Sequence, residues 1–120
     1  MSDLADLLRP LAEDGLGSLG VLLDQLDDGI AVFDSDWNVV WLNRTGARLL
    51  QRPASELIGR NLWATFPGSE ETQVYREYHR AVAEQREIEF EVLYGPLGGW
   101  FEVRAIPTPG GLLALYRNVT

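Results

Sequence analysis

The spacing of the apolar residues changes along the chain, and each change predicts a different kind of element. Leucines recur three and four residues apart in two early segments, residues 4–11 and 19–26. This spacing places them on one face of a helix. Gly15 and Gly17 separate the two segments, so the pattern predicts two short amphipathic helices within residues 1–27, ahead of a main domain at residues 28–120.

Two short apolar runs follow, at residues 30–33 and 39–42, and Asp, Ser and Asn side chains dominate the residues between them. Such side chains hydrogen-bond to nearby backbone and favour a chain reversal, so this stretch predicts a β-hairpin. Residues 34–38 also imitate the opening of a calcium loop. However, Val39 stands where that loop needs glycine and Thr45 where it needs a bidentate glutamate, which favours a simple turn.

The middle of the chain has helical spacing as far as about residue 86, interrupted by proline and glycine. Asn43 and Asn61 each stand where a side-chain oxygen could accept the free amides of a short helix. Pro67-Gly68 should end the second of these helices. Ser69 is predicted to begin a longer helix, with Glu70 and Glu71 at the positive end of its dipole.

From Ile88 onward the apolar period becomes two, which is the signature of strands with one buried face. Three strands are predicted, over residues 88–94, 100–105 and 112–119, with a turn at 107–111. Glu87, Glu89 and Glu91 share one strand face. Paired carboxylates can perform acid/base chemistry, but a solvated outer face explains them more simply. Together with the hairpin, these strands predict an α+β fold: a five-stranded antiparallel sheet with helices on one face.

The composition of the chain excludes several kinds of chemistry and partner. A chain of 120 residues is the size of one compact domain. It contains no cysteine, which excludes disulfides and thiolate catalysis, and all ten basic residues are arginine, which excludes a lysine Schiff base. The net charge of -8 argues against nucleic acid and anionic membranes as direct partners. No apolar run approaches the roughly 20 residues that cross a bilayer, so we predict a soluble, cytoplasmic protein.

The order of several short motifs resembles that of PAS sensor domains. The first half of the resemblance comprises a hairpin, a capped small-residue helix and a Leu-Ile-Gly-Arg-Asn step, carried by Asp34, Asp36, Asn43, Ala47, Leu57, Ile58, Gly59, Arg60 and Asn61. The second half comprises residues 100–103, Pro107, residues 110–112 and residues 117–120, so the match covers residues 26–120. Two positions depart from the family pattern. Gln51 stands where a glycine is frequent, and Asn118 where an aspartate is frequent.

The resemblance implies a non-enzymatic sensory and dimerisation module whose helices arch over the sheet and enclose a small apolar cavity. The candidate cavity walls are Trp63, Phe66, Val74, Tyr78, Phe90, Val92, Phe101 and Val103. Asn61, Tyr75 and Tyr78 could supply polar contacts to a ligand. The alternative is that these side chains fill the core and the protein is a pure dimerisation scaffold without a ligand.

Partners also follow from the resemblance. PAS domains often pair through N-terminal helices, which makes a homodimer the expected assembly; the candidate interface residues are Leu4, Leu7, Leu8, Leu11, Leu19 and Leu22. The same leucines could instead cover the protein's own sheet. Arg117, Asn118 and Thr120 are the candidate signal-relay residues. They would pass a change to an output domain after Thr120, such as a histidine kinase, a cyclic-dinucleotide enzyme or a transcription regulator.

His79 is the one histidine of the chain, and haem-binding PAS proteins ligate iron through a histidine on the corresponding helix. At 3.6 residues per turn it points about 110° from the middle of that helix's apolar stripe. We therefore expect a solvated flank position, which disfavours haem. The sequence also disfavours flavin, since no cysteine could form the adduct of light-sensing relatives. We expect either no ligand or a small apolar molecule. A small hydrolase or isomerase using His79 with a carboxylate is the weakest alternative.

Overall fold

The computed structural model describes residues 27–94 and 97–120. The predicted N-terminal helices, and with them the six leucines proposed for a dimer interface, lie outside the described residues.

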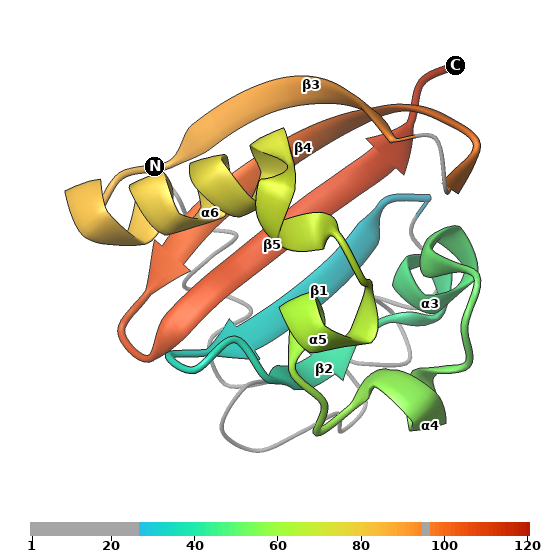
Figure 1. The fold of residues 1–120 in the computed structure, drawn as a ribbon, viewed down its shortest axis with the longest axis horizontal. Coiled ribbons are helices and arrows are strands. Elements are labelled where there is room, and N and C mark those ends of the chain that lie inside the picture. The colour runs from blue at the N-terminus through green and yellow to red at the C-terminus, as the bar shows by residue number, and fades with distance from the viewer. Residues whose placement is uncertain (1–26, 95–96) are drawn as a thin grey trace.

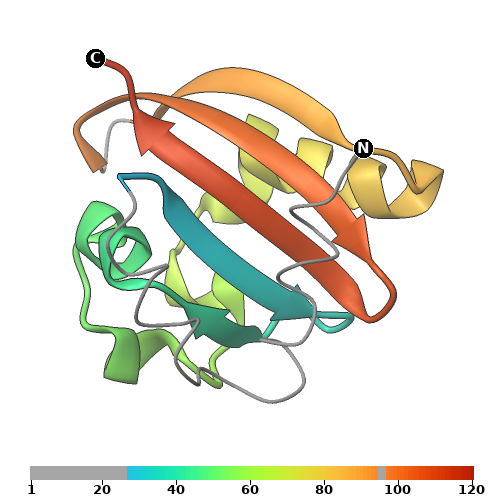
Figure 2. The same cartoon turned by 180° about the vertical axis from the view of Figure 1, so that it is seen from behind.

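The described part of the chain forms one antiparallel sheet with helices on one face, as the sequence predicts (Figures 1 and 2). The strand order is β2-β1-β5-β4-β3, and every neighbouring pair is antiparallel. The strands are β1 (Gly29–Asp34), β2 (Val39–Leu42), β3 (Ile88–Tyr94), β4 (Gly99–Thr108) and β5 (Gly111–Asn118). This order places the first strand beside the last, so the two halves of the chain share one core.

The predicted turn between β1 and β2 is confirmed. Asp34 Oδ1 accepts hydrogen bonds from the backbone N–H groups of Asp36 and Asn38, both at 2.9 Å. Trp37 lies at the tip with φ of 67°, a left-handed conformation that bulky residues rarely adopt. The turn therefore holds a large aromatic side chain in an unusual backbone conformation, which the packing described below compensates.

The segment between β2 and β3 contains α3 (Arg44–Leu50), α4 (Ala54–Leu57), α5 (Leu62–Thr65), the 3-10 turn η1 (Ser69–Glu71) and α6 (Gln73–Glu84). Both predicted caps are present: Asn43 accepts from Gly46 N, and Asn61 accepts from Trp63 N and Ala64 N. The predicted start of the long helix at Ser69 is wrong. Ser69 Oγ donates back to Trp63 O, whereas the N-cap of α6 is Thr72, whose Oγ1 accepts from Tyr75 N.

The last predicted turn is shorter than expected, because Pro107 belongs to β4 and pairs with Leu112. Proline cannot donate a ladder hydrogen bond and is confined to edges or bulges. The pairing of β3 with β4 ends at Ala105, so among the described strands β4 has only β5 as a neighbour beyond it. Pro107 is tolerated there because no described strand on the other side needs its missing N–H.

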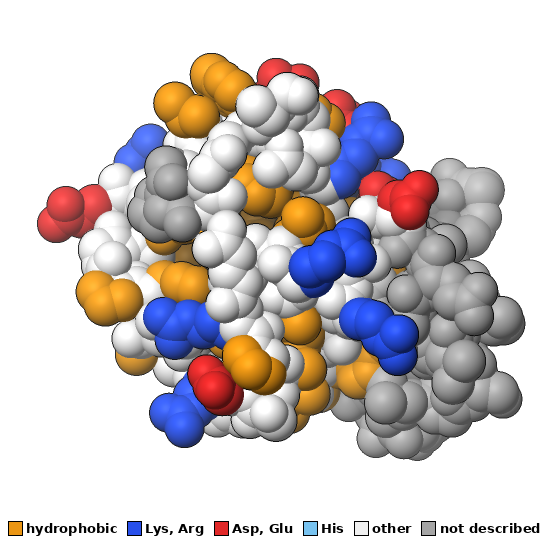
Figure 3. Space-filling view, turned by 90° about the vertical axis from the view of Figure 1, so that its right-hand side faces the viewer, with side chains coloured by type: hydrophobic (Ala, Val, Ile, Leu, Met, Phe, Trp, Pro, Cys, Tyr) orange, Lys and Arg blue, Asp and Glu red, His pale blue; other side chains and the backbone are white. Residues whose placement is uncertain are grey.

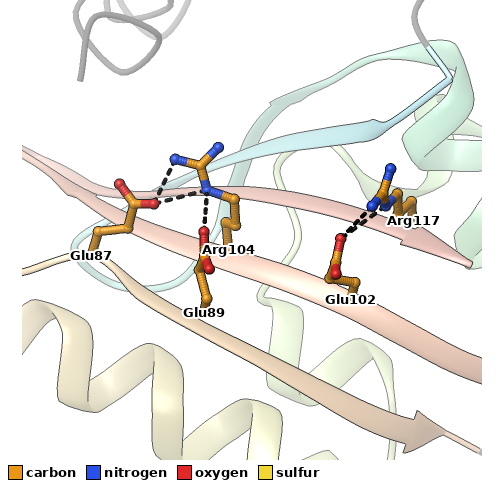
Figure 4. Close-up of polar contacts among 5 residues, drawn as sticks. All are labelled: Glu87, Glu89, Glu102, Arg104 and Arg117. Atoms are coloured by element: carbon orange, nitrogen blue, oxygen red, sulfur yellow. Dashed lines mark hydrogen bonds and ion pairs between the residues drawn. The ribbon is translucent and has the colours of Figure 1, made fainter. Parts of the chain in front are cut away.

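The two faces of the sheet differ. On the outer face, one half is apolar and buried; its members are Ile30, Val32, Trp41, Ile106, Leu113 and Leu115. The other half is charged (Figure 4). Arg104 contacts Glu87 at 2.5 Å and Glu89 at 3.2 Å, and Arg117 contacts Glu102 at 2.7 Å. The strand glutamates thus lie on an outer face as predicted, and two of them, Glu87 and Glu89, pair with Arg104. Each exposed pair contributes about 0–1 kcal/mol.

Candidate functional site

An apolar cavity of about 90 Å³ lies between the inner face of the sheet and the helical segment. Seven of the eight predicted wall residues line it: Trp63, Phe66, Val74, Tyr78, Val92, Phe101 and Val103. Phe90 does not line it. It is half-buried and meets the Tyr78 ring edge-on, with centroids 6.4 Å apart.

Further lining residues were not predicted. They are Phe33, Leu50, Leu62, Ser69, Thr72, Tyr94, Leu97 and Tyr116. The alternation of inward-facing positions carried a signal for Phe33, Tyr94 and Tyr116, since each lies on the inner face of its strand. Leu50, Leu62 and Leu97 come from short helices and a connection, where no period indicates which side faces the cavity. The cavity therefore depends on the helical path as much as on the sheet.

The lining is almost wholly apolar, and the hydroxyl groups of its serine and threonine are hydrogen-bonded. Ser69 Oγ donates to Trp63 O at 3.2 Å, and Thr72 Oγ1 donates to Ser69 O at 2.6 Å. No arginine, acid or histidine side chain is among the residues that line it. Binding sites for small molecules are mostly apolar with a few placed polar groups, which is the character of this cavity.

Two buried tyrosines border the cavity. Burial raises the pKa of the Tyr78 hydroxyl far above its usual range. Burial, with a smaller contribution from Tyr78, does the same to the pKa of Tyr116. Both hydroxyls are therefore neutral at any physiological pH. Tyr116 Oη donates to Gly46 O at 3.2 Å, whereas the Tyr78 hydroxyl makes no hydrogen bond within residues 27–94 and 97–120.

The expectation for His79 is corrected by the structure. Its side chain is half-buried, Nδ1 lies 2.8 Å from Tyr75 O, and its ring centroid lies 4.0 Å from that of Tyr75 and 4.7 Å from that of Trp37. The spacing of residues within α6 could not reveal the contact with Trp37, because Trp37 belongs to the hairpin turn. His79 thus belongs to an aromatic cluster with Trp37, Trp63, Tyr75 and Tyr78.

Trp63 joins this aromatic cluster to the cavity. Its ring centroid is 4.7 Å from that of Tyr75 and 5.5 Å from that of Trp37. The residue is only 7% exposed. Among the described residues, its indole Nε1 is the only buried side-chain nitrogen or oxygen without a hydrogen-bond partner. Nothing in the sequence indicated this, because a side chain's partners depend on the tertiary structure.

The face that carries α3 and α4 is rich in arginine although the chain is acidic overall. Residues 44–60 hold four arginines and one glutamate, and Figure 3 shows basic side chains standing among apolar ones on this side. The Arg52 guanidinium lies 4.9 Å from the centre of the Phe66 ring, and it borders an open hollow with Arg60. Both arginines are exposed, so the apolar cavity between the sheet and the helices is the stronger candidate site.

The candidate relay residues are all tied to the start of β4. Arg117 Nε donates to Glu102 Oε1 at 2.9 Å. Asn118 Oδ1 accepts from Thr120 N, and Thr120 Oγ1 accepts from Trp100 N, both at 2.9 Å. The next residue along β4 is Phe101, a cavity wall. Strand β4 therefore contacts both the cavity and the last residues of the described chain.

Within residues 27–94 and 97–120, no three histidine, aspartate or glutamate side chains gather in a way that could hold a metal ion. In the same ranges, no helix has the length and apolar character that crossing a membrane requires.

Comparison with known proteins assigns the family. Residues 23–120 match the family model described as the PAS fold. This match spans most of the chain, so the protein belongs to the PAS family. No curated protein sequence matches it significantly.

Solved structures resemble this fold at low sequence identity. A sensory box sensor histidine kinase from Vibrio cholerae superposes with a TM-score of 0.68 and 20% identity, over 99% of this chain and 98% of that one. A PAS domain from Colwellia psychrerythraea gives 0.67 and 23%, over 81% and 90%. The PAS domain of the quorum-sensing receptor RpfR from Cronobacter turicensis, in complex with BDSF, gives 0.65 and 18%, over 80% and 97%. At these identities the likeness concerns the fold.

Proposed function

We propose that this PAS domain is a non-enzymatic sensory module that binds a small apolar ligand in the cavity between the sheet and α5–α6. The observation that carries the proposal is the almost wholly apolar lining, which includes residues from both the sheet and the helices. A ligand there contacts two layers at once, so it can favour one arrangement of the helices over another. The neighbouring receptor domain solved with BDSF supports a ligand-binding role by analogy.

The signal is proposed to leave through β4 and β5. Phe101 and Val103 line the cavity, and Phe101 pairs with Asn118 in the sheet register. Thr120 is bonded to the N–H of Trp100, the neighbour of Phe101. A shift of β4 on ligand binding would therefore move the last described residues. Such coupling requires that the ligand bind the two arrangements with different affinity.

We further propose that the domain acts as a cytoplasmic homodimer linked to an output domain after Thr120, with Leu4, Leu7, Leu8, Leu11, Leu19 and Leu22 in the interface. The neighbour from a sensor histidine kinase supports a kinase as one kind of output. The proposal includes no haem. The packing of His79 between Tyr75 and Trp37 favours a structural role for its ring.

A matched pair of variants tests the cavity. Val92 is 9% exposed and points into the cavity, whereas Leu93 is 57% exposed on the opposite face of the same strand. Val92→Phe should fill the cavity, and Leu93→Phe adds a ring outside it. Native mass spectrometry and thermal shift against a library of small apolar molecules should give ligands for the wild type and Leu93→Phe, and none for Val92→Phe.

The same pair tests the rival function of a scaffold with a filled core. Inserting atoms into a well-packed core costs about 1–3 kcal/mol, so a filled core predicts a clearly destabilised Val92→Phe. An open cavity predicts a loss below about 1 kcal/mol, because the larger side chain enters existing space. Strong destabilisation together with no ligand for the wild type would favour the scaffold.

The dimer is tested by sedimentation. Leu8→Glu should produce monomers, because a charge replaces an apolar contact that the assembly would desolvate. Leu93→Glu, a change of the same kind at an exposed strand position, is the control and should leave the assembly unchanged. An unaltered dimer in Leu8→Glu would remove this leucine from the interface.

A further inference from the structure

We propose that the ligand of this cavity is a compact, uncharged molecule with an apolar body and one carbonyl oxygen, and that the indole N–H of Trp63 binds this oxygen. This inference rests on the proposed function, since it names the chemical class that the same cavity takes. Trp63 is then the residue that selects among apolar molecules of suitable size.

Hydrogen bonds from Asn61 and Ser69 hold the backbone of Trp63 on both sides. The Asn61 side chain accepts from Trp63 N at 3.0 Å, and Ser69 Oγ donates to Trp63 O at 3.2 Å. The ring meets Tyr75 in an edge-on arrangement, with an interplanar angle of 65°. The indole therefore lies in the cavity wall on a backbone that is hydrogen-bonded on both sides, with its ring packed against Tyr75.

The unpaired nitrogen is the observation that points to a ligand. Trp63 Nε1 is buried and has no hydrogen-bond partner among the described residues. An indole nitrogen can only donate, so its partner must be an acceptor. Native proteins rarely leave a buried donor unpaired, because each such group costs about 1–3 kcal/mol. The described residues offer no acceptor, whereas an oxygen atom on a molecule in the adjoining cavity would supply one.

The Tyr78 hydroxyl narrows the chemical class of the ligand to one that can accept two hydrogen bonds. Tyr78 lines the same cavity, and its hydroxyl, which has no hydrogen-bond partner within the described ranges, is not fully buried as Trp63 Nε1 is. Its raised pKa keeps it protonated and therefore a donor. A carbonyl oxygen has two lone pairs and can accept from two donors. No cation lines the cavity, so an ionised carboxylate would lose its hydration without a counter-charge, which disfavours it.

Size limits the ligand further. The volume of about 90 Å³ is smaller than the roughly 150 Å³ that holds benzene in an engineered cavity. A compact ring or short branched chain therefore fits better than a long one.

The test compares two molecules of nearly the same shape, cyclopentanone and methylenecyclopentane, in which a CH₂ group replaces the oxygen. Each is titrated into the full chain while the ¹H–¹⁵N resonance of the Trp63 indole is followed by NMR. We expect cyclopentanone to bind about three- to tenfold more tightly, the difference that one net hydrogen bond supplies. We also expect it alone to shift the Trp63 indole proton downfield.

Trp63→Phe keeps an aromatic ring and removes the donor, and Trp100→Phe is the matched control at a side chain that is 47% exposed. The preference for the ketone should vanish in the first variant and persist in the second. If Trp63→Phe fails to fold, the indole shift in the wild type decides alone.

The outcomes separate this inference from the proposed function. Equal binding of both molecules with an unmoved Trp63 indole resonance would overturn the carbonyl inference and leave the apolar site standing. The same unmoved resonance would follow if a buried water already satisfied the indole, and it counts equally against the inference. Binding of neither molecule, with no hit from the apolar library either, would count against the proposed function itself.

Discussion

Asn43 and Asn61 cap two helices in the same way, and each links its helix to the region of β1. The two linkages, here called joints, differ in how closely their surroundings are packed. Asn43 Oδ1 accepts from Gly46 N at the start of α3 and from Ile30 N in β1, and its Nδ2 donates to Asp28 O. Asn61 Oδ1 accepts from Trp63 N and Ala64 N at the start of α5, and its Nδ2 donates to Asp36 O in the hairpin turn. Each asparagine thus fastens a helix to one end of β1.

The surroundings of the two joints differ. Asn43 is 0% exposed, and a Cβ atom at Gly46 would lie 2.8 Å from Tyr116 Oη and 3.0 Å from Asn43 Oδ1. That joint is closely packed and its polar groups are paired. Asn61 is half-buried, and the helix that it caps carries the unpaired indole of Trp63 beside a cavity. We call the joint around Asn43 the frame and the joint around Asn61 the roof. We infer that the frame is rigid and that the roof can adapt, so that a ligand can change the structure there.

The largest effect is expected at the frame. Asn43→Ala removes the acceptor of two backbone N–H groups, one of them in a central strand, and leaves them buried and unpaired. At about 1–3 kcal/mol for each group, the free energy of unfolding should fall by about 2–5 kcal/mol, as measured by urea denaturation. A loss below about 1 kcal/mol would show that this joint is no more rigid than the other, and the comparison would fail.

Alkaline pH should weaken the fold through the two buried tyrosines, Tyr78 and Tyr116. The pKa values of Tyr78 and Tyr116 are raised in the folded state. Above about pH 10 the unfolded chain releases these protons while the folded chain keeps them, so stability is complete below pH 10 and falls as the pH rises. The expected loss is about 1.4 kcal/mol per pH unit for each tyrosine. Urea denaturation between pH 8 and pH 11 should show it.

Phenylalanine variants show which tyrosine causes the loss of stability above pH 10. Tyr78→Phe and Tyr116→Phe should each flatten the decline above pH 10. At pH 7, Tyr116→Phe should cost about 1 kcal/mol, because it removes the hydrogen bond to Gly46 O in the frame. Tyr78→Phe should cost less, since its hydroxyl has no partner within the described residues. An equal cost for both variants at pH 7 would argue against the difference between frame and roof.

A smaller effect is expected at the roof. Asn61→Ala removes the cap of a short helix at a half-buried position, which should cost about 1 kcal/mol. Hydrogen exchange should accelerate at Trp63 and Ala64, whose N–H groups lose their acceptor, and stay unchanged in β1 and β5. Faster exchange throughout the sheet would mean that the roof and the frame open as one unit.

The smallest effect concerns Gln51, which departs from the family pattern. Gln51 ends α3 with φ of 61°, so the position where relatives often have glycine is left-handed in this chain also. Gln51→Gly should raise the free energy of unfolding by about 0.5–1 kcal/mol. Gln51→Ala is the control, because it also removes the side-chain bond to Leu97 O and keeps the backbone strain. No difference between the two variants would show that the strain is negligible.

Local signals in the sequence were sufficient for most of the fold. The alternation from Ile88 to Tyr94 defines β3, and the polar turn after Asp34 defines the hairpin, because these patterns report on neighbouring residues alone. The two asparagine caps were predictable for the same reason. Ser69 was misjudged because its hydroxyl found a partner earlier in the chain, Trp63 O, and therefore did not cap the following helix.

The site was less predictable because it depends on contacts between distant segments. Three inward-facing strand residues, Val92, Phe101 and Val103, were predicted, whereas Phe33, Tyr94 and Tyr116 were missed. Leu50 and Leu97 reach the cavity by the path of the backbone. The position of His79 depends on Trp37, which belongs to a different element and adopts a rare backbone conformation. The unpaired nitrogen of Trp63 is a property of the assembled structure and leaves no pattern in the sequence.

The most direct test of the central claim, an open apolar site between the frame and the roof, is diffraction from crystals held under xenon pressure. Xenon enters dry apolar cavities of this kind. Our account predicts a xenon atom bounded by Trp63, Val92 and Phe101 in the wild type, and none in Val92→Phe. A wild-type cavity that stays free of xenon, with side chains filling the space, would contradict it.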